Sequence, residues 1–345
     1  MELSDIKRHT VRFIVEYTIF IAILIVGLYV WANVFQIAVA DYLDTDIWVT
    51  RHGWLGSGEY EIFGYVIHYQ FEGYSDYSFY YVHWGTNMVN GLMPYGDGFG
   101  FIEIDGVTNR NGAHMFPPLT SILYGLGMLI PVDNWGIGLL LAAFGFLTVF
   151  PVYGLGKELS NNRHVGEIAA LTYVLSPNVL YHTTYLWTNP APFIFFFFAG
   201  YYFLVRGNRH VGTLLIVTAA LFKQTAWFLG IPLVVYLLMK ERAPPPKQEE
   251  KPVQQPEEAS TSGEEPEEPK KSIVDRLFGF TNEYLDVKGF IVSVIVVLGF
   301  AGAIFYPFLV AQSNLWAFLR LAMGSFPLQS FTEVPGYGGP MRLQV

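Results

Sequence analysis

Two charged side chains stand out as groups that could carry chemistry. Asp76 opens an aromatic run that continues with Tyr77, and Lys223 separates two apolar runs much later in the chain. A carboxylate can act as the general base that takes the proton of a hydroxyl nucleophile. A cation can stabilise the negative charge that develops on a leaving phosphate. Such a pair would suit the transfer of a group from a phosphate ester to a hydroxyl.

Both residues also have simpler explanations. An acidic residue in a loop is more often solvated than catalytic. A lysine at the end of an apolar helix can extend along that helix until its ammonium group reaches the interface. A charge between two membrane segments is nevertheless a functional candidate. The sequence alone therefore leaves both alternatives open for Asp76 and for Lys223.

A second acidic group follows the first apolar segment. Asp41, Asp44 and Asp46 lie close together in the chain, and hard divalent cations such as Mg²⁺ or Mn²⁺ prefer carboxylate oxygens. Asp44 and Asp46 are therefore candidate metal ligands. In the alternative, these acids cap the end of the first helix and keep charge out of the membrane.

The elements that must position these residues are membrane helices. The chain has 345 residues, of which 52% are hydrophobic and 14% charged, whereas a soluble domain usually carries about 25% charged residues. A helix that spans the bilayer needs roughly 20 apolar residues, and backbone groups in lipid must be paired within the helix itself. The chain contains no cysteine, which excludes disulfides and thiolate sites. Apolar runs cover residues 13–40, 135–156, 165–181, 190–205, 211–222, 225–239 and 289–311.

The basic residues indicate the orientation, because Lys and Arg are enriched on the cytoplasmic side. They cluster at the N-terminus and in the short loops near 157–163, 206–209 and 240–242, but are sparse in 41–134. We predict an all-α polytopic membrane protein with about seven transmembrane helices, an outer loop that contains α and β structure, and a helix at 116–131 that dips into the membrane. The expected organisation is a cytoplasmic N-terminus (1–12), a first transmembrane helix (13–40), an outer loop with the candidate active site (41–134), transmembrane helices two to six (135–239), a cytoplasmic linker (240–288), a seventh helix (289–311) and an outer tail (312–345).

The two long polar segments differ in character. Residues 243–272 contain seven Pro, eight Glu and four Lys, a composition that cannot bury a core and predicts disorder. Residues 41–115 contain ten acids, two Arg and seventeen aromatic residues. Alternating stretches at 65–71 and 99–104 predict strands or hairpins, and 82–90 predicts an amphipathic helix that ends at Gly91.

Several short motifs resemble the GT-C superfamily of membrane glycosyltransferases when they are taken in order. Asp76 begins the first outer helix, a tyrosine follows about one turn later, and the helix is followed by Gly91-Leu-Met-Pro-Tyr95 and by Phe116-Pro-Pro-Leu119. The basic residues Lys157 and Arg163 are similar to those of a short inner loop of that family. The later motifs that carry the resemblance are Tyr185-Leu-Trp-Thr-Asn-Pro190 and the lysine-bearing turn Leu221-Phe-Lys-Gln-Thr-Ala-Trp-Phe-Leu-Gly-Ile-Pro232.

The resemblance implies a hexosyltransferase, mannosyltransferase-like, that uses a polyprenyl-phosphate sugar donor at the outer face of the bilayer. Asp76 would be the base, while Lys223 and His182 would face the donor phosphate. Asn189 marks a second outer-loop site, where several branches of the family have an aspartate. The acceptor would be a glycan, a lipid or a protein, and no nucleic acid is expected. The implied location is the cell membrane.

Two other functions remain open at this stage. The first is a transporter. Two observations count against it, because the helices contain few charges and show no symmetric pair of broken helices. A membrane scaffold whose outer loop binds a partner would need no positioned acid. The behaviour of Asp76 therefore separates the enzyme from the scaffold.

Overall fold

The computed structural model describes residues 3–44, 55–62, 64–72, 76–95, 102–104, 107–109, 114, 116–239 and 285–310. The chain divides into two compact units, one formed by Met1–Leu229 with Val297–Val345 and the other by Gly230–Val296. Asp46, the acidic linker at 243–272 and the predicted outer tail at 312–345 lie outside the described residues.

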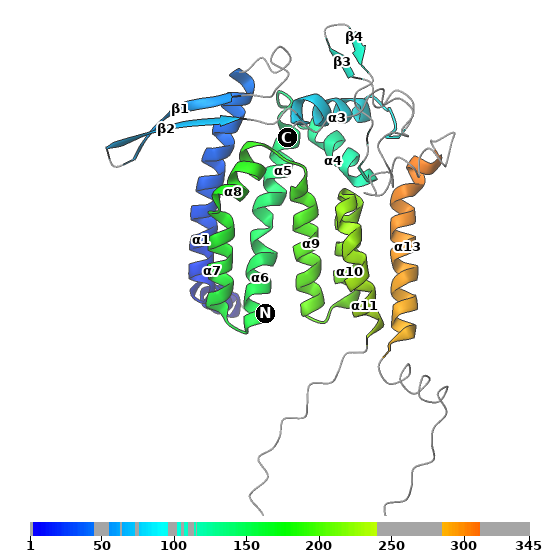
Figure 1. Cartoon of the computed structure of the whole chain (residues 1–345). Helices are drawn as coiled ribbons and strands as arrows, with labels where there is room; N and C mark the ends of the chain where they lie inside the picture. The colour runs from blue at the N-terminus through cyan, green and yellow to red at the C-terminus, as the bar shows by residue number, and fades with distance from the viewer. Residues whose placement is uncertain are drawn as a thin grey trace, which may run out of the picture. The chain divides into compact units, whose positions relative to one another are not determined.

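The first unit is built mainly from apolar helices that run beside one another (Figure 1). Its long helix α1, Leu3–Asp44, extends beyond the predicted 13–40 segment at both ends. The later helices are α5 (Gly136–Leu147), α6 (Val149–Ser160), α7 (Arg163–Val174), α8 (Pro177–Val179), the π-helical η2 (Leu180–Tyr185), α9 (Pro190–Val205), α10 (Arg209–Phe222) and the 3₁₀ segment η3 (Gln224–Leu229).

Helix length and composition confirm the predicted fold class, an all-α membrane protein. Within the described ranges, three helical segments are long and apolar enough to cross a membrane: Glu16–Leu43, Gly136–Ser160 and Val287–Val310. Shorter apolar helices cover Pro190–Val205, Arg209–Phe222 and Gln224–Leu238. Large apolar side chains such as Ile25 and Leu28 are exposed on α1, as expected for a lipid-facing surface. The total of seven crossings stays a prediction.

Small residues allow close approach of neighbouring helices. A Cβ atom on Gly200 of α9 would lie 2.9 Å from the carbonyl oxygen of Gly212 on α10. Likewise, a Cβ atom on Gly156 of α6 would lie 3.0 Å from the Cα of Gly166 on α7. Small residues at such contacts are typical of membrane helices, which associate through close packing rather than through the hydrophobic effect.

Two helices and two hairpins belong to the predicted outer loop. The π-helical turn η1 (Tyr77–Tyr81) continues directly into α3 (Val82–Val89), and Gly91 follows with a φ of 82°, which confirms the predicted end of that helix. Helix α4 (Pro118–Met128) begins at the Pro117-Pro118 pair. Figure 1 shows α3 and α4 together across one end of the helices α5 and α9. The hairpins are β1 (Leu55–Ile62) with β2 (Tyr65–Glu72) and β3 (Ile102–Ile104) with β4 (Val107–Asn109), both antiparallel.

The second unit contains α11 (Gly230–Leu238) and the start of α13 (Val287–Val310). An isolated bridge pairs Met239 with Leu285. The carboxylate of Asp286 then accepts a hydrogen bond of 2.9 Å from the backbone N–H of Gly289. This contact caps the N-terminus of α13 in the usual way.

Candidate functional site

The carboxylate of Asp76 lies at the start of η1 and is half-buried. Its backbone is already in the right-handed helical region, and its side chain makes no capping hydrogen bond to the helix. Burial raises the pKa of Asp76, while the positive charge of Lys223 lowers that pKa. A carboxylate that is partly desolvated, unused by the helix and close to a cation has the properties of a general base.

The residue after Asp76 fixes this turn to the membrane helices. The hydroxyl of Tyr77 donates a hydrogen bond of 2.8 Å to the carbonyl oxygen of Asn134 and accepts one of 2.9 Å from the N–H of Gly138. Tyr77 is fully buried. Because Asn134 and Gly138 flank the start of α5, this single hydroxyl ties the Asp76 turn to the entrance of a transmembrane helix.

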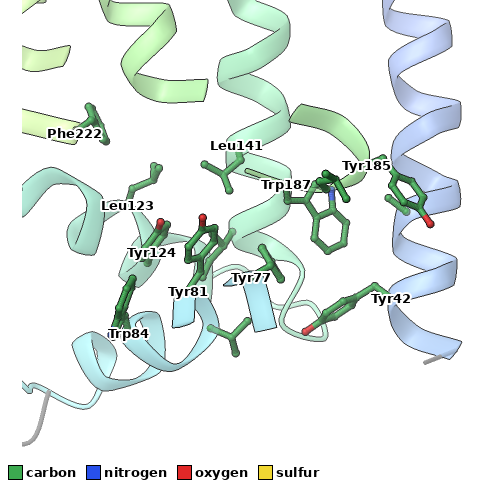
Figure 2. Close-up of a cluster of buried hydrophobic side chains, with 14 residues drawn as sticks. Tyr42, Tyr77, Tyr81, Trp84, Leu123, Tyr124, Leu141, Tyr185, Trp187 and Phe222 are labelled. Atoms are coloured by element: carbon green, nitrogen blue, oxygen red, sulfur yellow. The ribbon is translucent and has the colours of Figure 1, made fainter. Parts of the chain in front are cut away.

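A buried aromatic cluster surrounds this anchor (Figure 2). The ring of Trp187 lies 4.8 Å from the ring of Tyr77 and 5.4 Å from that of Tyr42 on α1. Trp187 is fully buried with a φ of 50°, a left-handed conformation that a bulky residue rarely adopts. The cluster thereby holds the 186–189 loop against α1, η1 and α5 at once.

Gly138 packs directly against this cluster, and the contact supports a prediction. A Cβ atom at position 138 would lie 2.4 Å from the ring of Trp187, so we expect Gly138→Ala to displace that ring. Overpacking of this kind costs about 1–3 kcal/mol. The variant should show a lower thermal unfolding temperature in detergent and reduced sugar transfer, because Trp187 precedes the site residue Asn189 by only two positions.

Gly299→Ala on α13 is the matched control, since no described residue outside its own stretch of helix lies within 4 Å of a Cβ added there. Its unfolding temperature should stay close to that of the unmodified protein. A Gly138→Ala protein as stable as the Gly299→Ala protein would contradict the role given to the Trp187 contact.

The cation of the site comes from the end of α10. Lys223 follows Phe222 with an extended backbone, φ −147° and ψ 128°, so the helix stops there and the side chain leaves its axis. The Nζ atom of Lys223 donates a hydrogen bond of 3.0 Å to Oδ1 of Asn189, at the start of α9. The hydroxyl of Thr120 on α4 donates to the carbonyl oxygen of Phe222. Helix α4 therefore holds the turn that carries the lysine.

A buried tyrosine lies beside these polar groups. Tyr124 is fully buried on α4, one turn after Thr120. Its hydroxyl is close enough to the Asn189 side chain and to the Asp76 carboxylate to feel both electrostatically. The side chains of Asn189 and Tyr81 both lie close enough to interact with this hydroxyl, although no hydrogen bond within strict geometric limits is formed among the described residues. The site thus contains a carboxylate, a cation, an amide and a phenol from four different segments.

The structure brings together three of the residues proposed from the sequence, Asp76, Asn189 and Lys223. His182 is exposed, and the contact described for its side chain is with the ring of Tyr181, 5.3 Å away. Its backbone carbonyl accepts a hydrogen bond of 2.8 Å from the Thr188 hydroxyl. In the described part of the chain, no contact links the His182 imidazole to Lys223, and its role in binding the donor phosphate stays a prediction.

The predicted metal site lies at the limit of what the structure describes. Asp44 is the last residue of α1, and Asp46 lies outside the described residues. Asp41, the third acid of that group, accepts a hydrogen bond of 2.9 Å from the hydroxyl of Tyr185. The described residues contain no group of three or more His, Asp or Glu that could hold a metal ion. A divalent cation, Mg²⁺ or Mn²⁺, at Asp44 and Asp46 therefore stays a prediction.

Sequence reasoning missed Tyr77, Thr120 and Tyr124. Aromatic residues are common at membrane interfaces, which hid the two tyrosines in a loop rich in them. One signal was present in α4, where Thr120 and Tyr124 are spaced i, i+4 on an otherwise apolar helix. Residues at this spacing share a helix face, so two hydroxyls pointing the same way could have been noticed.

A comparison with protein families supports the same conclusion as the geometry. The family model of dolichyl-phosphate-mannose-protein mannosyltransferases matches residues 116–250. The match supports a membrane glycosyltransferase of the GT-C type. The match confirms the resemblance seen in the motifs, and it places Thr120, Tyr124, Asn189 and Lys223 inside the matched region. Asp76 precedes that region, so its place in the glycosyltransferase site rests on the geometry. No curated protein and no solved structure matches the chain.

Proposed function

We propose that this glycosyltransferase moves a sugar from a lipid-phosphate donor to a hydroxyl acceptor on the outer side of the membrane. The observation that carries the proposal is the convergence of Asp76 and Lys223, from opposite parts of the chain, at the end of the helices where α3 and α4 lie. The matching family, the dolichyl-phosphate-mannose-protein mannosyltransferases, suggests mannose on dolichyl phosphate as donor and a protein as acceptor.

In the proposed reaction, Asp76 and Lys223 each have one role. The acceptor oxygen forms a bond to the anomeric carbon of the sugar while the bond from that carbon to the phosphate oxygen breaks. Asp76 takes the proton of the acceptor hydroxyl, as a general base. The leaving lipid phosphate keeps the bonding electron pair, and the ammonium of Lys223 stabilises its charge. The lipid tail stays in the bilayer throughout, which explains why the site is built where membrane helices begin and end.

Donor consumption is the direct test. The purified protein would be placed in liposomes with a panel of polyprenyl-phosphate sugars, mannose first, and with Ser/Thr-containing peptides as acceptors. We expect loss of donor and appearance of glycosylated peptide. Donor that is stable with every sugar and acceptor, while a labelled solute crosses the liposome membrane, would favour a transporter instead.

The proposed orientation gives a separate prediction. With the N-terminus and residues 243–272 inside and 41–134 outside, a cysteine placed at Ser57 on β1 should react with a membrane-impermeant maleimide from outside intact cells. A cysteine at Ser260 should react only after the membrane is opened. The chain contains no native cysteine, so each variant carries a single thiol. The reverse labelling pattern would overturn the orientation.

A further inference from the structure

A carboxylate at the outer end of α1 is engaged by a hydrogen bond from a distant part of the chain. Asp41, in the last turn of α1, accepts a hydrogen bond of 2.9 Å from the hydroxyl of Tyr185. Tyr185 is buried at the end of η2, and Figure 2 shows it beside α1. A negative charge near the C-terminus of a helix is disfavoured by the helix dipole. Helix α1 itself therefore does not explain a carboxylate at this position.

The short segment after Tyr185 carries the partner of the site lysine. Asn189 follows Tyr185 by four residues, and its Oδ1 atom accepts the hydrogen bond of 3.0 Å from Lys223. Within this segment, the N–H and the hydroxyl of Thr188 both donate to the carbonyl oxygen of His182, at 3.0 Å and 2.8 Å. The segment is thus internally bonded, and a shift of Tyr185 would be passed on to Asn189. We call residues Tyr185–Asn189, together with Lys223, the lysine arm of the site.

The residue next to Asp41 contacts the other side of the site. The ring of Tyr42 lies 5.6 Å from the ring of Tyr77, with the two planes at 89°, and Tyr77 directly follows Asp76. One turn of α1 therefore supports both sides, since Asp41 holds the lysine arm and Tyr42 packs against the turn that carries the candidate base. The relative position of the carboxylate of Asp76 and the ammonium of Lys223 depends on this shared support.

We propose that the hydrogen bond between Asp41 and Tyr185 is a positioning contact for the transfer reaction, which keeps the lysine arm aligned with Asp76. The inference rests on the proposed function, since it concerns the alignment of the base and the cation in that reaction. Asp41 and Tyr185 act through Asn189 and take no part in the bond changes themselves. A misplacement of about 1 Å caused far from the chemistry can slow a reaction about a hundredfold, so one such contact is enough to matter.

Tyr185→Phe tests the contact, because it removes the hydroxyl and keeps the ring. The direct readout is the rate at which acetic anhydride acylates Lys223 in protein held in nanodiscs, followed by mass spectrometry. Lys223 is half-buried and bonded to Asn189, so release of the lysine arm should expose its amine. We expect acylation about tenfold faster, as for loss of one hydrogen bond to a charged group. This readout requires no sugar donor.

The same variant should change the pH profile of sugar transfer. The charge of Lys223 lowers the pKa of Asp76, and a lysine that has moved away lowers it less. The acid limb of kcat/KM should therefore move to higher pH. A variant that only reduced the amount of folded protein would lower the activity at every pH and leave the position of this limb unchanged.

The controls separate the contact from general loosening of the fold. Tyr173→Phe removes a hydroxyl that donates a hydrogen bond of 2.8 Å to the carbonyl of Gly145, a bond of similar length outside the lysine arm. Its acylation rate and acid limb should match those of the unmodified protein. Asp41→Asn keeps an oxygen that can accept from Tyr185 and should leave Lys223 protected, whereas Asp41→Leu should reproduce the effect of Tyr185→Phe.

Each outcome decides for or against the contact. Faster acylation in the Tyr185→Phe and Asp41→Leu proteins supports it even if the unmodified protein consumes no sugar donor, a result that would count against the proposed function alone. Unchanged acylation in the Tyr185→Phe protein would overturn the inference. Equally fast acylation in the Tyr173→Phe protein would also overturn it, because the effect would then be general. An Asp41→Asn protein that behaves like Asp41→Leu would assign the charge of Asp41 a different role.

Discussion

Asp76→Asn protein is expected to bind a lipid-phosphate sugar almost as well as the unmodified protein and to transfer that sugar at least a hundredfold more slowly. General-base catalysis typically contributes about 10²–10⁴ in rate. The base acts in the transition state, so kcat should fall while donor affinity changes little. The measurements are turnover of a radiolabelled donor in liposomes and equilibrium binding of the same donor.

Two controls show whether a loss of turnover comes from loss of the base: the unfolding temperature of the Asp76→Asn protein and the turnover of a variant at a second aspartate. Because burial raises the pKa of Asp76, the ionised form is disfavoured by folding, and a neutral amide of the same shape should not lower the unfolding temperature at neutral pH. Asp133→Asn is the control, since Asp133 is exposed in the same predicted outer loop. Full turnover by the Asp76→Asn protein would remove the base assignment and move attention to Asp44 and Asp46.

Lys223→Met should weaken donor binding about ten- to a hundredfold. Hydrogen bonds to charged groups contribute about 1.5–3 kcal/mol, and each 1.4 kcal/mol corresponds to roughly tenfold in affinity. Methionine keeps an apolar stem of similar length, so the change mainly removes the ammonium and its bond to Asn189. The effect should appear in KM and in direct binding more than in the thermal unfolding temperature.

The same variant should change the pH profile in a defined direction. Burial raises the pKa of Asp76, and the charge of Lys223 lowers it. The base is active as the carboxylate, so activity is lost as the pH falls through that pKa. Without the lysine charge the pKa rises further, and the acid limb of kcat/KM, which reports the free enzyme, should move to higher pH.

Lys157→Met serves as control for both readouts. Lys157 is on α6, where its ammonium lies 5.8 Å from the centre of the Tyr17 ring, and it is not part of the candidate site. The donor affinity of the Lys157→Met protein and the acid limb of its kcat/KM profile should match those of the unmodified protein. A Lys223→Met protein with an unshifted acid limb would show that the two charges do not interact in the active state.

The helices of this protein were predictable from the sequence because their signal is local. Apolar runs and basic clusters report on each segment separately, and Gly91 marked the end of α3 for a steric reason that needs no tertiary information. The exact ends of the helices were harder to predict from the sequence. Helix α1 runs from Leu3 to Asp44, since polar residues at both ends of an apolar run can continue a helix outside the membrane.

The candidate site was only partly predictable. Asp76 and Lys223 were noticed because charges are rare in such a chain. The hydrogen bond between Asn189 and Lys223, the Tyr77 anchor and the buried position of Tyr124 depend on how loops fold onto helix ends. Such contacts join segments far apart in the chain, and no pattern within either segment encodes them.

The number of residues in the π-helical turn η1 determines the direction in which Asp76 points. The N–H of Val82 bonds to the carbonyl of Tyr77, five residues back, so this turn holds one residue more than an α-helical turn. Deleting one residue between Tyr77 and Tyr81 would permit an ordinary α-helix, yet it would rotate Asp76 about the axis by roughly 100° relative to α3. The carboxylate would then face away from Lys223. The length of this turn is therefore as important to the site as the side chains that it carries.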